Sequence, residues 1–307
     1  MQSFKTYENG NVLVEIYEDG TKVRSFENKE GAKPTHPETI DVKISNFCDL
    51  DHICTFCHEG SNRKGKHGDL KHLLYTLSSS LPEGVELAIG GGNPLAHPDL
   101  YDFLFKAKAL GFICNLTVNQ LHVQRYKDLL WTLINDDLIK GLGISHRAEK
   151  YGRSFVEFAS YEHTVIHLIA GIDDWGVIGN LHEVGFKKFL VLGYKTFGRG
   201  VEYKKSNSPQ VDANLKQWYM FIAKYIGSDK DMVISFDNLG IEQLNIKRFF
   251  TDKGWEKFYM GDDGEFSMYI DAIEQMYSPT SRSPHSERVG FNQMKLNEFF
   301  QRIRNHE

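Results

Sequence analysis

Three of the four cysteines of this 307-residue chain lie within ten positions, in the stretch NFCDLDHICTFCHEGS (residues 46–61, the cysteine stretch below). They are Cys48, Cys54 and Cys57, and their spacing is C-x5-C-x2-C. Four cysteines are too few for a disulfide framework in a chain of this length, whereas grouped cysteines bind zinc or the irons of iron–sulfur clusters. The spacing therefore predicts a metal site.

Two kinds of metal centre fit three thiols. A structural zinc ion takes four protein ligands, and His52, His58 or His67 could supply the fourth. Structural zinc sites usually draw two pairs of ligands from two short loops, and the sequence has no second pair of cysteines. A [4Fe–4S] cluster held by three cysteines leaves one iron open for another ligand. The spacing favours the iron–sulfur cluster over zinc.

The elements that must position these cysteines follow a regular order along the chain. Short apolar segments alternate with amphipathic stretches such as residues 97–111 and 120–134. Repeated strand–helix units are typical of a parallel sheet covered by helices. We therefore predict an α/β fold, a partial (β/α)6-type TIM barrel. The expected strands are residues 39–47, 85–91, 112–119, 139–146, 163–171, 186–194 and 231–237.

The two ends of the chain differ from this repeat. Residues 12–27 alternate and turn at Asp19–Gly20, which predicts a β-hairpin. In the last part, residues 264–281 are expected to form strand and residues 291–304 a helix. The predicted organisation is an N-terminal hairpin and polar linker (1–37), the partial barrel (38–244) and a C-terminal extension (245–307).

Alternation along the predicted strands separates an apolar face from a small or polar face. We expect the apolar face to pack against helices and the other face to line the barrel. Cys114 shares its face with Leu116 and Val118, so we expect a buried thiol that binds no metal. The residues expected on the inner face are Asn115, Thr117, Asn119, Gly141, Gly143, Ser145, His167, Ile169, Gly171, Ser235 and Asp237.

The cysteine stretch and its position after the first predicted strand resemble the radical S-adenosylmethionine (radical SAM) enzymes. The commonest spacing in that superfamily is C-x3-C-x2-C, so this chain carries a variant with two extra residues. The resemblance implies that Cys48, Cys54 and Cys57 hold a single [4Fe–4S] cluster whose fourth iron binds S-adenosylmethionine. It further implies reductive cleavage of S-adenosylmethionine to a 5′-deoxyadenosyl radical, which abstracts hydrogen from a substrate.

Further matches to the superfamily stand in order at the ends of later strands, over roughly residues 38–200. The segments are AIGGGNPLAHPDL, LTVNQ, GISH, HLIAGIDD and VLGYKTFGRG, with Asn93 where the superfamily usually has Glu. The resemblance assigns His167, Lys195 and Arg199 to a substrate or to a carboxylate. It assigns to S-adenosylmethionine Phe56, Gly90, Gly91, Gly92, Asn93, Asn119, Ser145, Ile169, Gly171 and Gly193.

Each of these later matches has a simpler explanation when it is taken alone. Glycine and proline mark turns in many proteins, so the glycine-rich segment is a weak signal by itself. Ser145 could bond to backbone at a strand end, and His167 could be an interior histidine. The loop that contains Lys195 and Arg199 could be solvated. The argument for a radical SAM site rests on the order of the matches together with the cysteines.

Composition and charge limit the binding partners and the cellular location that we expect. The net charge is −5 with no basic tract, which argues against generic nucleic-acid binding. No apolar run reaches the roughly 18 residues of a membrane span, and the sequence MQSFKTYENG lacks a signal pattern. We therefore expect a cytoplasmic protein that binds no membrane.

Three functions remain open at this point. The first is a radical SAM enzyme, an oxidoreductase or transferase, that acts on a peptide or protein. The second is the same chemistry on a nucleotide, a sugar or another small metabolite. The third is a zinc-stabilised binding protein without enzymatic activity. For the enzyme, the resemblance implies S-adenosylmethionine, an unidentified substrate and an electron donor such as flavodoxin or ferredoxin as partners.

Overall fold

The structure is a computed structural model. Some parts of the predicted segments lie outside the described residues, namely the first two residues and residues 27–30 of the hairpin and linker, residue 51 of the cysteine stretch, and the last two residues of the extension. The described residues are 3–26, 31–50, 52–148, 150–225 and 231–305.

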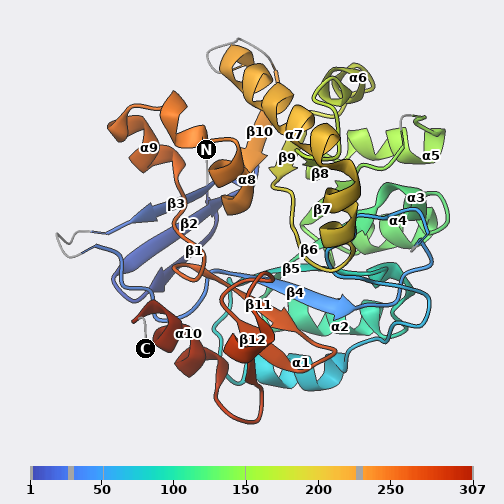
Figure 1. The fold of residues 1–307 in the computed structure, drawn as a ribbon. Coiled ribbons are helices and arrows are strands. Elements are labelled where there is room, and N and C mark those ends of the chain that lie inside the picture. Colours follow the sequence, from blue (N-terminus) through green and yellow to red (C-terminus); the bar gives the residue numbers. More distant parts are fainter. Residues whose placement is uncertain (1–2, 27–30, 51, 149, 226–230, 306–307) are drawn as a thin grey trace.

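Seven parallel strands form the centre of the molecule, and each pairs with the next one along the chain (Figure 1). All seven strands expected from the sequence are present. The last, β10, does not pair with the first, β4, so the described strands form an open arc. The strands are β4 (Thr39–Ser45), β5 (Glu86–Gly91), β6 (Ile113–Asn119), β7 (Gly141–Ser145), β8 (Thr164–Ile169), β9 (Lys188–Leu192) and β10 (Val233–Phe236).

Helices cover the outside of this arc. The predicted helix at residues 120–134 is divided in two, because the chain leaves helical geometry at Tyr126. The longest helix, α7, bends at Asn207, two residues before Pro209, which lacks the N–H that a regular helix needs. The helical segments between the strands are α1 (Leu70–Ser78), η1 (Pro94–Ala96), α2 (Leu100–Ala109), α3 (Gln120–Val123), α4 (Lys127–Asn135), α5 (Arg153–Val156), η2 (Glu157–Ser160), α6 (Val177–Glu183) and α7 (Arg199–Tyr225).

The main core lies between the outer face of the strands and these helices. Ile40, Val42 and Ile44 of β4 are buried there, as are Leu73 and Leu77 of α1. The alternation within each strand follows the sequence expectation, since the apolar residues face the helices. Cys114 is 3% exposed and belongs to this core, which confirms the expected burial of the thiol.

The C-terminal segment extends the barrel sheet. Strand β11 (Ser267–Asp271) pairs in parallel with β4, and β12 (Met276–Ser278) and β13 (Val289–Gly290) follow in antiparallel order. The expected strand and helix of this region are therefore both present, although they join the barrel more closely than an appended unit would. The remaining helical segments are α8 (Asn238–Gln243), η3 (Ile246–Phe249), α9 (Asp252–Phe258), η4 (His285–Glu287) and α10 (Leu296–Arg304).

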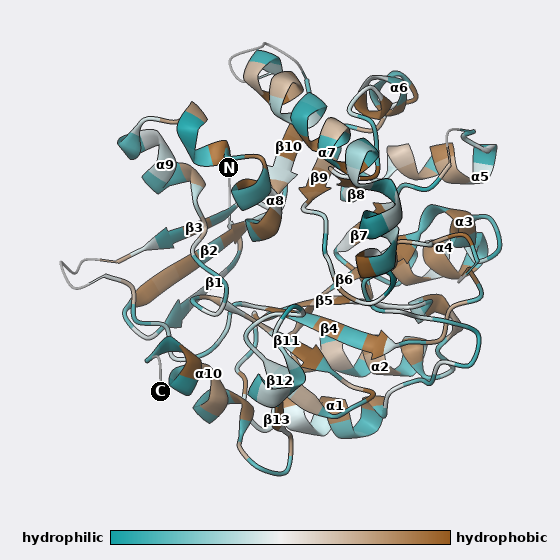
Figure 2. Ribbon diagram, in the orientation of Figure 1, coloured by the Kyte–Doolittle hydropathy of each residue, from teal (hydrophilic) through white to brown (hydrophobic). Residues whose placement is uncertain are grey.

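The N-terminal segment is a three-stranded antiparallel sheet of β1 (Ser3–Asn9), β2 (Val12–Tyr17) and β3 (Lys22–Ser25). The predicted hairpin corresponds to β2 and β3. Strand β2, largely brown in Figure 2, packs its valines and Ile16 against Ile113 at the start of β6. Lys140 Nζ lies 2.6 Å from Glu18 Oε2, and Lys188 Nζ donates to the Asp19 carbonyl oxygen. The sheet therefore closes the amino-terminal end of the barrel, opposite the cysteine stretch.

The buried side chain of Asn9 ties β1 to the segment that leads into the barrel. Its amide nitrogen donates to the His36 carbonyl oxygen at 2.9 Å, and its amide oxygen accepts from the N–H groups of Thr35 and His36. We expect Asn9→Ala to lower the free energy of unfolding by about 2 kcal/mol, because buried backbone groups lose their partners. Chemical denaturation measures this loss. The exposed neighbour Glu8 serves as the control, and an equal loss in Glu8→Ala would contradict the assignment.

Candidate functional site

A cavity of about 420 Å³ opens inside the barrel, at the side of the cysteine stretch. Its wall is built from the cysteine stretch, the inner faces and ends of the barrel strands, and residues of β11 and the segment after β12. The sequence-predicted residues that line it are Cys48, Cys54, Cys57, Phe56, Gly90, Gly91, Gly92, Asn119, Ser145, His167, Ile169, Gly193, Lys195 and Arg199.

Two of the predicted site residues lie outside the lining of the cavity. Asn93 is fully buried, and neither its amide nitrogen nor its amide oxygen has a hydrogen-bond partner among the described residues. Gly171 packs behind the wall, where an added Cβ would lie 3.0 Å from Tyr194 and from Val211. The tertiary structure therefore separates these two residues from the others of the set.

The three thiols of the cysteine stretch face this one cavity. Cys48 is 9% exposed, and Cys54 and Cys57 are half-buried. Burial raises the pKa of Cys48 to about 11, and the nearby thiols of Cys54 and Cys57 contribute to the rise. Asn119 Nδ2 donates to Cys54 Sγ at 3.7 Å, which links the stretch to the carboxyl end of β6. The sulfur atoms are thus gathered where β4 and β6 end.

Arg199, at the start of α7, binds the cysteine stretch from one side. Its guanidinium donates to the carbonyl oxygens of Cys54 and Ser61 at 2.9–3.2 Å. Its backbone N–H donates to the Cys57 carbonyl oxygen at 3.0 Å. The preceding Gly198 has φ +49°, and a Cβ there would lie 2.4 Å from the His58 carbonyl oxygen. The guanidinium that the resemblance assigned to a carboxylate is therefore engaged with backbone of the cysteine stretch.

The glycine-rich turn after β5 contacts the stretch from the other side. Gly91 has φ +119°, and a Cβ at Gly91 or Gly92 would lie 2.3 Å from the Ser45 oxygen or 2.2 Å from the Phe47 oxygen. The N–H groups of Gly92 and Asn93 donate to these same two carbonyls at 2.6 Å. Glycine is needed here because the backbones touch. These two N–H groups are occupied, so a ligand at the turn would meet carbonyl oxygens.

A third anchor of the cysteine stretch is one that sequence reasoning missed. Asp49 accepts from His122 Nε2 at 2.8 Å and forms an ion pair with Arg125 at 3.0 Å. His122 lies in the short helix α3 and is buried. Burial lowers the pKa of His122 despite the hydrogen bond with Asp49. No spacing rule connects Asp49 with a histidine 73 positions away, so only the fold reveals this contact.

The spacing of the possible metal ligands bears on the choice between zinc and an iron–sulfur cluster. Among the described residues, only Cys48, Asp49 and His122 bring three ligand atoms within 4.8 Å of one another. Zn–S bonds of 2.3 Å place the sulfurs of a tetrahedral zinc site about 3.8 Å apart. The three thiols form no such group, so they are spaced more widely than one zinc ion requires.

Two of the three histidines proposed for a zinc site, His58 and His67, are engaged elsewhere. His67 bonds to Ser45 Oγ at 2.9 Å and packs against His97, and His58 pairs with Glu59 at 3.2 Å. Glu59 in turn pairs with Lys43 Nζ at 2.7 Å, and Lys43 also reaches Asp271 at 3.1 Å. This chain of charges joins the end of the cysteine stretch to β4 and β11.

The inner wall also carries His167 and Lys195. Burial and, to a smaller extent, the charge of Arg147 lower the pKa of His167 to about 4, so the imidazole is neutral at pH 7. Gly143 leaves the room for this ring, since a Cβ there would lie 2.6 Å from it. Lys195 Nζ donates to Ser281 Oγ at 3.1 Å, which connects the loop after β9 to the C-terminal segment.

Several cavity residues were absent from the sequence-based site. Asp41 and Lys43 share the inner face of β4, and the alternation in TIDVKIS contained that signal. Arg147 follows the GISH segment, and its guanidinium lies 4.8 Å from the centre of the Phe56 ring. Tyr269 and Ser281 come from the C-terminal segment, whose place beside β4 no local pattern reveals.

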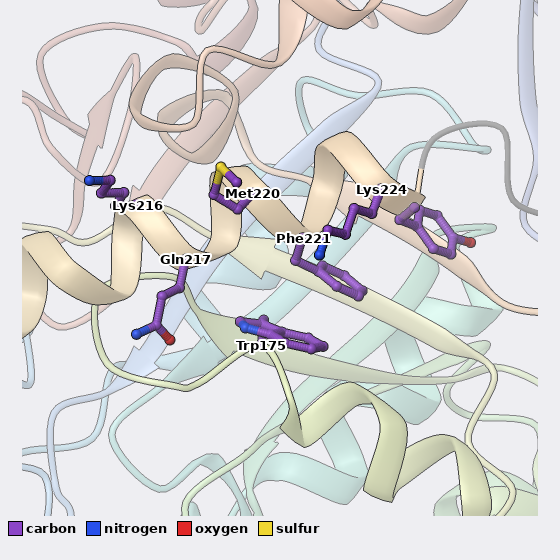
Figure 3. A pocket seen from close by; sticks show the side chains of 7 residues that line it. Trp175, Lys216, Gln217, Met220, Phe221 and Lys224 are labelled. Atoms are coloured by element: carbon purple, nitrogen blue, oxygen red, sulfur yellow. The ribbon is translucent and has the colours of Figure 1, made fainter.

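A second hollow, of about 450 Å³, lies outside the barrel between the loop after β8 and α7 (Figure 3). Trp175 stacks against Phe221 at 4.9 Å, and Gln217, Met220, Tyr225 and two lysines complete the wall. It has no thiol, carboxylate or histidine in its lining, so the chemistry belongs to the barrel cavity.

Known proteins resemble this chain closely in fold but only weakly in sequence. No protein-family model matches the chain. A 7,8-dihydro-6-hydroxymethylpterin dimethyltransferase of Methanocaldococcus jannaschii is 24% identical over 119 residues, which are 36% of this chain. The match spans only 23% of the length of that relative.

Solved structures resemble the chain over most of its length. Streptococcus suis SuiB bound to the precursor peptide SuiA has a TM-score of 0.60 at 15% identity, over 88% of this chain and 67% of SuiB. The protein anSMEcpe with bound S-adenosylmethionine has a TM-score of 0.59 at 15% identity, over 88% and 82%. The predicted partial TIM barrel is therefore confirmed as the fold. Within the described residues, no helix is both long and apolar enough to span a membrane.

If Arg199 holds the cysteine stretch in place, its loss should expose the thiols. We expect the metal-free Arg199→Met protein to react with a thiol reagent about tenfold faster at Cys54 and Cys57, because three hydrogen bonds that oppose opening are lost. Mass-spectrometric labelling rates measure this change. Lys64→Met, an exposed change on the loop that follows, should leave the rates unaltered, and equal rates in all three proteins would refute the role of Arg199.

Proposed function

We propose that the protein is a radical SAM enzyme in which Cys48, Cys54 and Cys57 hold one [4Fe–4S] cluster. The observation that supports this most is that the three thiols face one cavity at the carboxyl end of a partial barrel. Active sites of barrel enzymes lie at this end. The cluster, when bound, supplies the electron for reductive cleavage of S-adenosylmethionine.

The donor set fits an iron–sulfur cluster. The thiols are spaced more widely than a single zinc ion requires, and they lie on one connected stretch. Two hydrogen bonds reach the sulfurs, from the Leu50 N–H to Cys48 and from Asn119 to Cys54. Such hydrogen bonds tune the potential of a cluster and orient its ligands. Arg199 and the glycine-rich turn keep the backbone of the stretch in one position.

The remaining lining residues fit S-adenosylmethionine beside the cysteines. The carbonyl oxygens of the glycine-rich turn would accept hydrogen bonds from its amino group, and Arg147 would pair with its carboxylate. Phe56, Ile169 and Gly193 would contact the adenine, while Asn119 and Ser145 offer hydrogen bonds. Lys195 remains a second candidate partner for a carboxylate. Arg147 takes the place in this scheme that the sequence had suggested for Arg199.

The substrate in this proposal is a peptide or protein. The structures of similar fold include SuiB with a precursor peptide and anSMEcpe with the Cp18Cys peptide. The N-terminal sheet lies at the opposite end of the barrel, away from the cavity, so it does not contact a peptide bound there. Tyr269 and Ser281 of the C-terminal segment reach the cavity instead.

Chemistry on a small molecule is the alternative. The relative from Methanocaldococcus jannaschii, matched over 119 residues, is named for its action on a pterin. Metal analysis after anaerobic purification distinguishes a radical SAM enzyme, whichever substrate it uses, from a zinc-stabilised binding protein. About four irons and four sulfides per chain with broad visible absorbance support the enzyme, and one zinc per chain with no iron would refute it.

The cysteine assignment predicts a clear contrast within this cysteine-poor chain. We expect Cys48→Ala, Cys54→Ala and Cys57→Ala each to abolish reductive cleavage of S-adenosylmethionine and to lower the iron content. Cys114→Ala is the matched control, because its thiol lies in the core. It should keep iron and cleavage and lose about 1 kcal/mol of stability to a small cavity. Full iron and parental cleavage in any of the first three variants would contradict the assignment.

The glycine-rich turn predicts a contrast in cofactor affinity. Gly91→Val should weaken binding of S-adenosylmethionine more than Asn93→Ala, because Gly91 lines the cavity at positive φ whereas the buried Asn93 is not part of the lining. Isothermal titration with the reconstituted proteins measures both affinities, and the unfolding temperatures report whether the variants fold. Affinities that match the parent in both folded variants would exclude the turn from the binding site.

A further inference from the structure

Asp41 lies deep on the inner wall of the barrel, below the level of the cysteine stretch. It stands in the middle of β4, level with Tyr269 of β11 on one side and Ala88 of β5 on the other. Its side chain lines the cavity. Alternation puts the neighbouring Ile40 and Val42 into the core, so the carboxyl group can only face inward.

Unlike the acidic groups around it, Asp41 has no hydrogen-bond or ion-pair partner within the part of the chain that the structure describes. Among the described residues, no hydrogen-bond donor or cation lies within bonding distance of its carboxyl group. Glu59 and Asp271 pair with Lys43, and Asp263 pairs with Arg282. Asp237 accepts the N–H groups of Gly193 and Gly240. The side chain of Asp41 is exposed to the cavity, so its carboxylate is open to a donor group of a ligand.

The charges near Asp41 favour a cation as that partner. Burial raises the pKa of both Asp41 and Asp237, and the ammonium of Lys195 opposes the rise in each case. Lys195 forms no ion pair within 4.0 Å among the described residues, so it neutralises neither carboxylate directly. Arg282 also acts on Asp237, whereas the charged neighbours of Asp41 are one ammonium, Lys195, and two further carboxylates, Asp237 and Asp263.

The walls beside Asp41 suit the stem of a basic side chain. Tyr269 lies beside Asp41 in the sheet and offers an aromatic face, and Leu190 of β9 adds an aliphatic surface to the wall of the cavity. Basic side chains commonly lay their methylene groups along such surfaces while the charged end finds a carboxylate. A flat guanidinium can also bind a carboxylate through two parallel hydrogen bonds.

We propose that Asp41 binds a positively charged nitrogen group of the substrate, a guanidinium or an amine, at the inner end of the cavity. This deepens the proposed function and rests on it, because it places the substrate next to S-adenosylmethionine. Asp41 is a substrate-binding residue in this proposal and takes no part in the cleavage of the cofactor.

Two capped amino acids of nearly equal shape test the proposal. N-acetyl-arginine methylamide carries the charge, and N-acetyl-citrulline methylamide is its neutral isostere. Their dissociation constants are measured by calorimetry on the cluster-containing protein saturated with S-adenosylmethionine. The proteins are the parent, Asp41→Asn, and Asp102→Asn as a matched control on the exposed outer helix α2, where Asp102 pairs with Lys106. Iron content and unfolding temperature show whether each variant is folded.

We expect the parent to bind the arginine probe at least about tenfold more tightly than the citrulline probe, the effect of one charge-assisted hydrogen-bonded pair. Asp41→Asn should remove this preference, and Asp102→Asn should keep it. A parent that binds S-adenosylmethionine but does not distinguish the probes, or a preference that survives in Asp41→Asn, would overturn the role of Asp41. A parent that holds no cluster and binds no S-adenosylmethionine would instead contradict the proposed function.

Discussion

Docking of the cysteine stretch onto the open end of the barrel is the contact on which the site depends. The stretch has almost no regular secondary structure, so its own backbone bonds cannot hold three sulfurs in place. Arg199 binds it from α7, the glycine-rich turn binds it from β5, and Asp49 ties it to α3. Three elements far apart in the chain thus fix the position of one loop.

The same docking explains why small residues gather at this end of the barrel. Gly91, Gly92 and Gly198 sit where backbones touch, and a side chain at any of them would push the stretch away. Inside the barrel, Ala88 and Gly90 of β5 and Gly143 of β7 leave space that larger residues would fill. A packed outer core and a hollow inner face therefore follow from one alternation along each strand.

The two ends of the chain act at opposite ends of the barrel. The N-terminal sheet covers the amino ends of the strands with its own small apolar cluster, so it stabilises the barrel without reaching the cavity. The C-terminal segment adds β11 beside β4 and brings Tyr269 and Ser281 into the cavity wall. Variation in the C-terminal segment would therefore alter the cavity directly, whereas variation in the sheet would act through stability.

Local patterns in the sequence were enough to predict the seven parallel strands, the burial of Cys114 and the gathering of the three thiols at a strand end. These features depend on alternation and spacing, which act over a few residues. The partners of those residues could not be predicted in this way. Examples are the bonds of Arg199 to backbone, the burial of Asn93 outside the cavity lining, the hydrogen bond of His122 to Asp49 and the unpaired carboxylate of Asp41. Each depends on which distant segments meet. Only the tertiary structure decides that, because contacts between distant segments leave no periodic trace in the sequence.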